Sequence, residues 1–259
     1  MPPMLVVEAL SHAYAPGLAV TEELSFHVNA GEIVSIVGPS GCGKTTLLKI
    51  MAGLLRPTGG TVHFEGEPVR SIPAGLAMVF QEYSRSLLPW TTVNSNVELP
   101  LLYLPIKAGE RQSRVRESLQ AVGLVGFGDH YPWQLSGGMQ QRVAIARAIA
   151  YRPKLLLMDE PFASVDAQTR ADLEDLVAAL RDRFQITMVL VTHDIDESVY
   201  LSDRVIVLSH APSRILAQVG IDLTRPRDQI NTKANLSFVE KRSLVAQLIK
   251  RPTATDMKQ

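Results

Sequence analysis

The 259-residue sequence has one cysteine and no excess of charge of either sign. With Cys42 as the sole cysteine, no disulfide can form within the chain, and we expect a reducing compartment. Lysines and arginines together number 26, as do aspartates and glutamates, so the formal net charge is zero. A chain-wide basic surface for nucleic acid is therefore excluded, and we expect no nucleic-acid partner.

Long apolar runs are also missing. A membrane-spanning helix needs about 18 or more apolar residues, and the best candidate, VELPLLYLPI at 97–106, is shorter and carries Glu98, Pro100 and Pro105. The opening MPPMLVVEALSHAY lacks the basic region, apolar stretch and small-residue cleavage site of a signal peptide. We therefore expect a soluble chain, with any membrane role supplied by a partner.

The apolar segments that are present follow the pattern of an α/β protein. Short strands are predicted at LVVEAL, LSFHV, EIVSIV, LAMVF, LLLMDE, ITMVLVTHD and RVIVL, with a hairpin in TVHFEGEPV. The later strands alternate with predicted helices, which indicates a parallel sheet covered on both faces. Between 81 and 134 the strand signals fade, and a polar helix at about 108–122 indicates a helical insertion. Residues 237–250 predict an amphipathic helix.

The first segment that points to chemistry is GPSGCGKTT at 38–46, which matches the phosphate-loop pattern G-x-x-x-x-G-K-[ST] between a strand and a helix. Its glycines let backbone N–H groups turn toward phosphate oxygens at the positive end of the helix. We expect Lys44 to reach the β- and γ-phosphates and Thr45 to bind Mg²⁺. The candidate nucleotide-binding residues here are Gly38, Pro39, Ser40, Gly41, Cys42, Gly43, Lys44, Thr45 and Thr46.

Simpler interpretations of this loop stay open at this point. One is a glycine turn with an exposed lysine and no phosphate. Cys42 has two candidate roles, donation of its backbone N–H to phosphate or redox chemistry of its thiol, and we favour the backbone role.

A pair of acids follows the apolar run of LLLMDE at 155–160. Because ligands bind at the carboxyl ends of parallel strands, Asp159 is expected to hold Mg²⁺ and Glu160 to polarise the attacking water. Two surface acids after a strand are the alternative, and the phosphate loop upstream disfavours it.

A second group of backbone donors is predicted in LSGGMQQR at 135–142. Ser136 is a plausible N-cap, and a Ser-Gly-Gly segment at a helix start presents N–H groups to an anion. One nucleotide does not need two such groups from the same chain.

With this motif the sequence resembles the ATP-binding cassette (ABC) family. The resemblance covers about residues 4–220 and is carried by six motifs in order: GPSGCGKT (38–45), Gln81, LSGGM (135–139), LLLMDE (155–160), SVD (164–166) and His193 in LVTHD. It implies an α/β fold with a RecA-like P-loop NTPase core and a mainly parallel sheet, an antiparallel β subdomain and an inserted α-helical subdomain. Residues 1–225 would form the ATPase domain, with the helical subdomain at about 82–150, and 226–259 a C-terminal helical extension and tail.

The resemblance also implies that two chains pack head to tail with ATP between them. Ser136, Gly137 and Gly138 of one chain would then bind the γ-phosphate held by Lys44 of the other. Gln81 would sense Mg²⁺ and the attacking water.

Three more residues take roles from the resemblance. His193 would contact the γ-phosphate, although the acid-rich HDIDE leaves a metal-ligand alternative that no second His/Cys cluster supports. Asp166 would couple the two sites across the interface. Tyr14 would stack on adenine, and a strand-end tyrosine without a ligand is its alternative.

Some positions depart from the family's pattern or fit it in two ways. Ser164 and Val165 stand where Ala-Leu is common, and Trp133 stands where histidine is frequent. Trp90 and Trp133 each fit either a packing or an interface role.

The segments FQEYSRSLLPWTTVNSNVELPL, YPWQLSGGMQQRVAIARA and DEPFASVDAQTR look most like ATPases of nitrate, taurine and alkanesulfonate importers. The expected function is therefore ATP hydrolysis coupled to uptake of a small solute. The expected cofactors are ATP and Mg²⁺. The expected assembly is a homodimer on membrane permease subunits, at the cytoplasmic face of the plasma membrane, with a periplasmic or lipid-anchored solute-binding protein. The alternatives are an exporter or lipid-extraction ATPase, a soluble cassette ATPase of DNA repair or translation, and a nucleotide switch.

Overall fold

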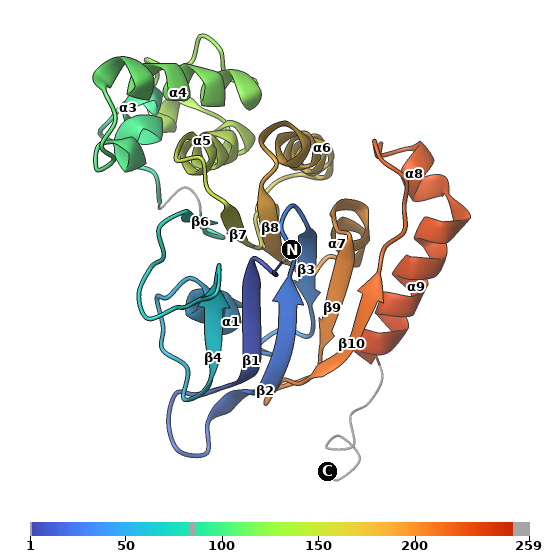
Figure 1. Cartoon of the computed structure of the whole chain (residues 1–259). Coiled ribbons are helices and arrows are strands. Elements are labelled where there is room, and N and C mark those ends of the chain that lie inside the picture. The colour runs from blue at the N-terminus through green and yellow to red at the C-terminus, as the bar shows by residue number, and fades with distance from the viewer. Residues whose placement is uncertain (1, 83–85, 251–259) are drawn as a thin grey trace. The chain divides into compact units, whose positions relative to one another are not determined.

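The computed structural model describes residues 2–82 and 86–250. Two units make up the chain: Met1–Ala74 with Ile186–Gln259, and Gly75–Gln185 (Figure 1). The predicted tail at 251–259 lies outside the described residues. Over the described ranges, no helix has the length and apolar character needed to cross a membrane.

The first unit contains an antiparallel sheet with strand order β2-β1-β4-β5. Its strands are β1 (Leu5–Ala13), β2 (Ala19–Val28), β4 (Gly59–Phe64) and β5 (Glu67–Pro68). Glu65 and Gly66 both have positive φ, 50° and 84°, which is the geometry that joins two strands with a two-residue turn. The predicted hairpin is therefore confirmed, and so is an antiparallel β subdomain.

A second set of strands in this unit has the order β10-β9-β3-β8. The strands are β3 (Ile33–Val37), β8 (Thr187–Val191), β9 (Arg204–Leu208) and β10 (Ile215–Gly220). β3 is parallel to both β8 and β9, and every residue of β3 and β8 is buried, as expected for strands of a parallel sheet that is covered on both faces. β10 runs antiparallel to β9, so the predicted parallel sheet has one antiparallel edge strand.

Four helices of the first unit follow these strands. They are α1 (Lys44–Met51), α7 (Ile195–Leu201), α8 (Asn231–Ala234) and α9 (Leu236–Lys250). α7 packs against β3 and β9, and α9 packs against β9, β10 and α7 (Figure 1). The amphipathic helix predicted near the C-terminus is thus α9, which buries Phe238 and Val245.

The second unit combines a parallel strand pair with the helical insertion. Its strands are β6 (Leu76–Val79) and β7 (Leu155–Asp159), and its helices are α3 (Val93–Glu98), η1 (Leu99–Leu101), α4 (Ala108–Ala121), η2 (Pro132–Gln134), α5 (Gly137–Ala150) and α6 (Ala167–Phe184). α3, α4 and α5 pack on one another. The predicted polar helix is α4, and the predicted α/β fold with an inserted helical subdomain is confirmed.

Candidate nucleotide-binding and catalytic residues

The phosphate loop joins buried β3 to α1 and depends on Gly43. Gly43 has φ 96° at the N-cap of α1, a backbone conformation that residues other than glycine rarely adopt. A Cβ at this position would lie 2.4 Å from Val20 Cγ1. Glycine is therefore required here both by the backbone angle and by the close approach of β2.

Lys44 lies along the loop instead of pointing into solvent. Its side chain is buried, and Nζ donates hydrogen bonds to the carbonyls of Gly38 at 2.9 Å and Pro39 at 3.1 Å. The alternative of a glycine turn with an exposed lysine is wrong on this point. The loop therefore holds a positive charge at the start of α1, where the helix dipole also favours an anionic phosphate.

Cys42 is buried in the same loop. Burial raises the pKa of its thiol, and this effect exceeds the opposing influence of the nearby Lys44 charge. A thiol held in its protonated form is a poor nucleophile, which favours the backbone-amide role over a redox role.

Tyr14 follows the end of β1 and contacts the loop directly. Its hydroxyl and the Thr46 hydroxyl are 2.9 Å apart, and the ring is 61% exposed. The ring of buried His12 meets it edge-on, with centroids 4.9 Å apart. Tyr14 is therefore a strand-end residue that is also placed beside the phosphate loop. His12 supports it, and nothing in the sequence pattern singled out that residue.

His193 stands between β8 and α7, next to a well-formed helix start. The Asp194 side chain caps α7 by accepting from the Glu197 N–H at 3.1 Å. Asp196 and Glu197 occupy the first turn, where acids suit the helix dipole. The described residues contain no group of three or more His, Cys, Asp or Glu that could hold a metal ion.

Asp159 is the last residue of the fully buried strand β7, and Glu160 follows it. Asp159 is 4% exposed, and Glu160 adopts φ 43°, a left-handed conformation that is uncommon for a side chain of this size. Gln81 Nε2 lies 3.4 Å from Glu160 Oε2. The second unit therefore brings together Gln81 and Glu160, both of which the sequence analysis assigned to the attacking water.

The Ser-Gly-Gly segment opens α5 as predicted. The Ser136 hydroxyl accepts from the Met139 N–H at 3.3 Å, which confirms the N-cap. Gly138 lies close against α6, since a Cβ there would be 2.5 Å from Thr169 Cγ2. Glycine at the second position of α5 therefore serves the packing of α5 against α6.

Asp166 caps α6 through Thr169. Its carboxylate accepts from the Thr169 N–H at 3.0 Å and from the Thr169 hydroxyl at 2.6 Å. The hydroxyl and amide of Thr169 lower the pKa of Asp166 because they stabilise its charged form. The side chain therefore has a local structural role beside the one implied by the resemblance.

Gln141 is a site residue that sequence reasoning did not select. Its side chain is fully buried, and Nε2 donates to the Pro161 carbonyl at 2.7 Å. Pro161 is the residue directly after Glu160, so Gln141 ties α5 to the loop that carries the proposed base. The available signal was a glutamine on the apolar face of a predicted helix.

The two tryptophans are both largely exposed. Trp90 is 72% and Trp133 is 70% exposed, and the Trp133 ring stacks on Tyr131 with centroids 6.0 Å apart. Neither is a core packing residue.

Comparison with known proteins gives the family. A sequence model of the family described as ABC transporter matches residues 21–163, more than half of the chain. The chain belongs to this family. It is accordingly a P-loop ATPase of the ABC type, which binds and hydrolyses ATP as part of a transport system.

Individual relatives agree with this family. The aliphatic sulfonates import ATP-binding protein SsuB 1 of Pseudomonas savastanoi pv. phaseolicola is 44% identical over 230 residues, covering 88% of this chain and 91% of that one. The nitrate import ATP-binding protein NrtD of Synechocystis sp. is 43% identical over 221 residues, covering 85% and 81%. A dimeric ATP-binding cassette solved in a post-hydrolysis state with ADP and Pi matches with a TM-score of 0.70 and 33% identity, covering 83% and 99%. The predicted likeness to nitrate and sulfonate import ATPases is confirmed.

Proposed function

We propose that this chain is the ATP-hydrolysing subunit of an importer for a small solute of the nitrate, taurine or alkanesulfonate kind. The import ATPases for nitrate and for aliphatic sulfonates, at 43% and 44% identity, support this proposal. Because those two solutes differ, the identity of the solute depends on other subunits and on no residue of this chain.

The observation that carries the mechanism is the presence of two separate helix starts suited to phosphate. α1 begins at the phosphate loop, with Gly43 as an N-cap that offers no side-chain acceptor. α5 begins at Gly137 after the Ser136 cap. One such helix N-terminus is enough for the β- and γ-phosphates of one ATP, so the N-terminus of α5 is available to a nucleotide bound by another chain. In a homodimer that encloses two Mg·ATP, the N-termini of α1 and α5 would each contact a nucleotide.

In this mechanism each chemical step has a side chain of suitable chemistry. Lys44 would neutralise charge on the phosphates, and Thr45, Asp159 and Gln81 would hold Mg²⁺. Glu160 accepts the proton of the attacking water. When bound, Mg²⁺ would supply charge neutralisation for the phosphates.

The remaining contacts come from three other residues. His193 donates a hydrogen bond to the γ-phosphate. Asp166 links the two sites across the dimer interface. Tyr14 supplies a face for adenine, which agrees with its contact to Thr46 of the phosphate loop.

The second unit supplies the surface for the membrane partner. Trp90 and Tyr103 are 72% and 86% exposed, and exposed aromatic side chains are favoured anchors of protein interfaces. We assign 1–225 to the ATPase domain, about 82–150 to the helical subdomain that docks on the permease, and 226–259 to a C-terminal extension. The assembly lies at the cytoplasmic face of the plasma membrane and works with a solute-binding protein.

The dimer is tested with Glu160→Gln, which removes the base and keeps the size of the side chain. We expect this variant to elute as a dimer with millimolar Mg·ATP and as a monomer with Mg·ADP, measured by size-exclusion chromatography with light scattering. Ser136→Ala in the same background is the matched control and weakens the ATP-bound dimer. A Glu160→Gln chain that stays monomeric at millimolar Mg·ATP contradicts the shared-site mechanism.

Transport direction needs a separate experiment. We expect the chain to co-purify with a permease and its ATPase rate to rise when the loaded solute-binding protein is added to the reconstituted complex. Stimulation by a solute added on the cytoplasmic side alone would favour an exporter instead.

A further inference from the structure

The helix that follows His193 is too short to be stable by itself. α7 has seven residues, Ile195–Leu201, and isolated helices of this length do not persist in water. Its N-terminal end is capped by Asp194, the neighbour of His193. Its C-terminal carbonyls need partners from elsewhere in the chain.

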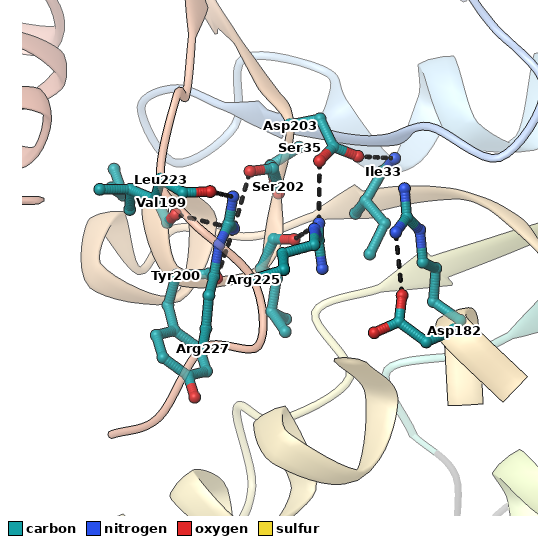
Figure 2. Close-up of polar contacts among 12 residues, drawn as sticks. Ile33, Ser35, Asp182, Val199, Tyr200, Ser202, Asp203, Leu223, Arg225 and Arg227 are labelled. Atoms are coloured by element: carbon teal, nitrogen blue, oxygen red, sulfur yellow. Dashed lines mark hydrogen bonds and ion pairs between the residues drawn. The ribbon is translucent and has the colours of Figure 1, made fainter. Parts of the chain in front are cut away.

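Arg227, beyond the last strand of the core, supplies several of these partners. Its Nη1 donates to the carbonyls of Tyr200 at 2.7 Å and Ser202 at 2.9 Å, with Val199 at 3.5 Å (Figure 2). A guanidinium at a helix C-terminus satisfies free carbonyls and opposes the negative end of the helix dipole.

Arg225 completes the same end of the helix. Its Nη2 donates to the Leu201 carbonyl at 3.2 Å and to Asp203 Oδ1 at 2.9 Å. The other oxygen of Asp203 accepts from the N–H of Ile33, the first residue of β3, at 2.9 Å (Figure 2). One arginine therefore reaches both the end of α7 and, through Asp203, the start of the strand that leads to the phosphate loop.

The C-terminal helices make two more contacts with α7. Lys233 lies over the ring of fully buried Tyr200, with Nζ 4.9 Å from the centroid. Arg242 of α9 pairs with Asp196 in the first turn of α7 at 3.7 Å. Both ends and one side of α7 are thus held by residues that follow β10.

We propose that Arg225 and Arg227 are positioning residues for His193, so that the segment 225–250 acts as a brace that sets the reach of this histidine toward the γ-phosphate. A rigid helix moves as a unit, so a shift of the carbonyl end of α7 displaces the backbone at Asp194 and His193. This inference rests on the proposed role of His193 in hydrolysis.

Arg227 is the better of the two residues for a test. Arg225 also holds Asp203 and through it β3, whereas the hydrogen bonds of Arg227 described above go to carbonyls at the end of α7, with one more to the Leu223 carbonyl at 3.5 Å. The variants are Arg227→Gln, which removes the guanidinium, and Arg227→Lys, which keeps a charged donor. Arg214→Gln is the matched control, because Arg214 makes an exposed ion pair with Glu22 on the same unit.

For Arg227→Gln we expect kcat for ATP to fall about tenfold while KM changes less than about twofold, because misplacing a catalytic group slows chemistry more than binding. Arg227→Lys should restore most of the rate, and Arg214→Gln should match the parent chain. The His193 Cε1–H resonance, assigned with His193→Ala, should shift in Arg227→Gln and not in Arg214→Gln.

A double-mutant cycle separates this role from simple destabilisation. In a His193→Ala background, single-turnover hydrolysis should lose less than about twofold on adding Arg227→Gln, since the group being positioned is gone. The same tenfold loss in both backgrounds, or an unmoved His193 resonance, overturns the brace. If His193→Ala alone keeps full activity, the proposed role of His193 fails first, and the brace fails with it.

Discussion

Gln141 is well suited to a mutational test of stability, because its amide nitrogen is hydrogen-bonded and its amide oxygen is not. Nε2 donates to the Pro161 carbonyl at 2.7 Å, while Oε1 is buried with no hydrogen-bond partner among residues 2–82 and 86–250. Replacement by leucine loses a hydrogen bond of about 1 kcal/mol and leaves the Pro161 carbonyl unpaired, at about 1–3 kcal/mol. The same change removes the unpaired Oε1, and this offsets a similar amount of unfavourable free energy. We expect Gln141→Leu to lower the free energy of unfolding by only about 1 kcal/mol.

Gln141→Glu is expected to be far worse, although it is the closer match in shape. The donor facing the Pro161 carbonyl becomes a carboxylate oxygen, and a charge buried without a partner costs several kcal/mol. The unpaired oxygen also remains. We therefore expect a glutamate variant that is several kcal/mol less stable than the leucine variant, or one that folds only when its carboxyl is protonated.

The assay is urea unfolding at neutral pH, followed by circular dichroism, with thermal midpoints recorded in parallel. A loss of 1 kcal/mol corresponds to about 2–4 °C for a chain of this size. Gln120→Leu and Gln120→Glu are the matched controls, because Gln120 is exposed on α4 and both changes should stay within about 0.5 kcal/mol. Equal stabilities of the leucine and glutamate variants at position 141 would refute the reasoning. They would show that a side chain at this position does not have to stay buried against the Pro161 carbonyl.

Two further predictions concern the phosphate loop and the cap of α6. Gly43→Ala should abolish ATP binding in calorimetry and lower the free energy of unfolding by about 2 kcal/mol or more. The reason is that φ 96° is unfavourable for alanine and that its Cβ would lie 2.4 Å from Val20 Cγ1. Unchanged binding would mean that the loop adopts another conformation. Asp166→Ala should be less stable than the parent chain at neutral pH. Because the pKa of Asp166 is lower in the folded state, the difference in stability should be fully present above the unfolded-state pKa of about 3.9. It should shrink as the pH falls through the lower folded-state pKa, which urea unfolding at several pH values measures. A difference that grows on acidification would contradict the assigned cap.

Much of the fold follows from local patterns in the sequence. β3, β7 and β8 are short and mostly apolar, and each is buried along its whole length. The Glu65-Gly66 turn and the Ser136 cap are set by residues within a few positions of one another. Such features are predictable because their physical causes lie inside a short window.

The contacts that hold the candidate site together could not be predicted in this way. Ala9 adopts φ 45° and interrupts the register of β1, yet no turn residue marks it in the sequence. Arg225 and Arg227 stand in the segment RPRDQ, which has the composition of a solvated turn, and their partners at the end of α7 lie more than twenty residues upstream. Gln141 and Pro161 are likewise separated by 20 positions. Neither periodicity nor motif spacing reports on a side chain that bonds to a distant backbone carbonyl.

Two of these distant bonds share a feature with a chemical consequence. Gln141 binds the carbonyl next to Glu160, and Arg227 binds carbonyls of the helix next to His193, so both hold the backbone beside a proposed catalytic side chain. The Gln81 contact with the Glu160 carboxylate, at 3.4 Å, is longer than most hydrogen bonds of this kind. The 2.7 Å bond from Gln141 to the Pro161 carbonyl is shorter, and it holds the backbone directly after Glu160. A side chain bonded to a neighbouring carbonyl can therefore position a proposed catalytic group without contacting that group itself.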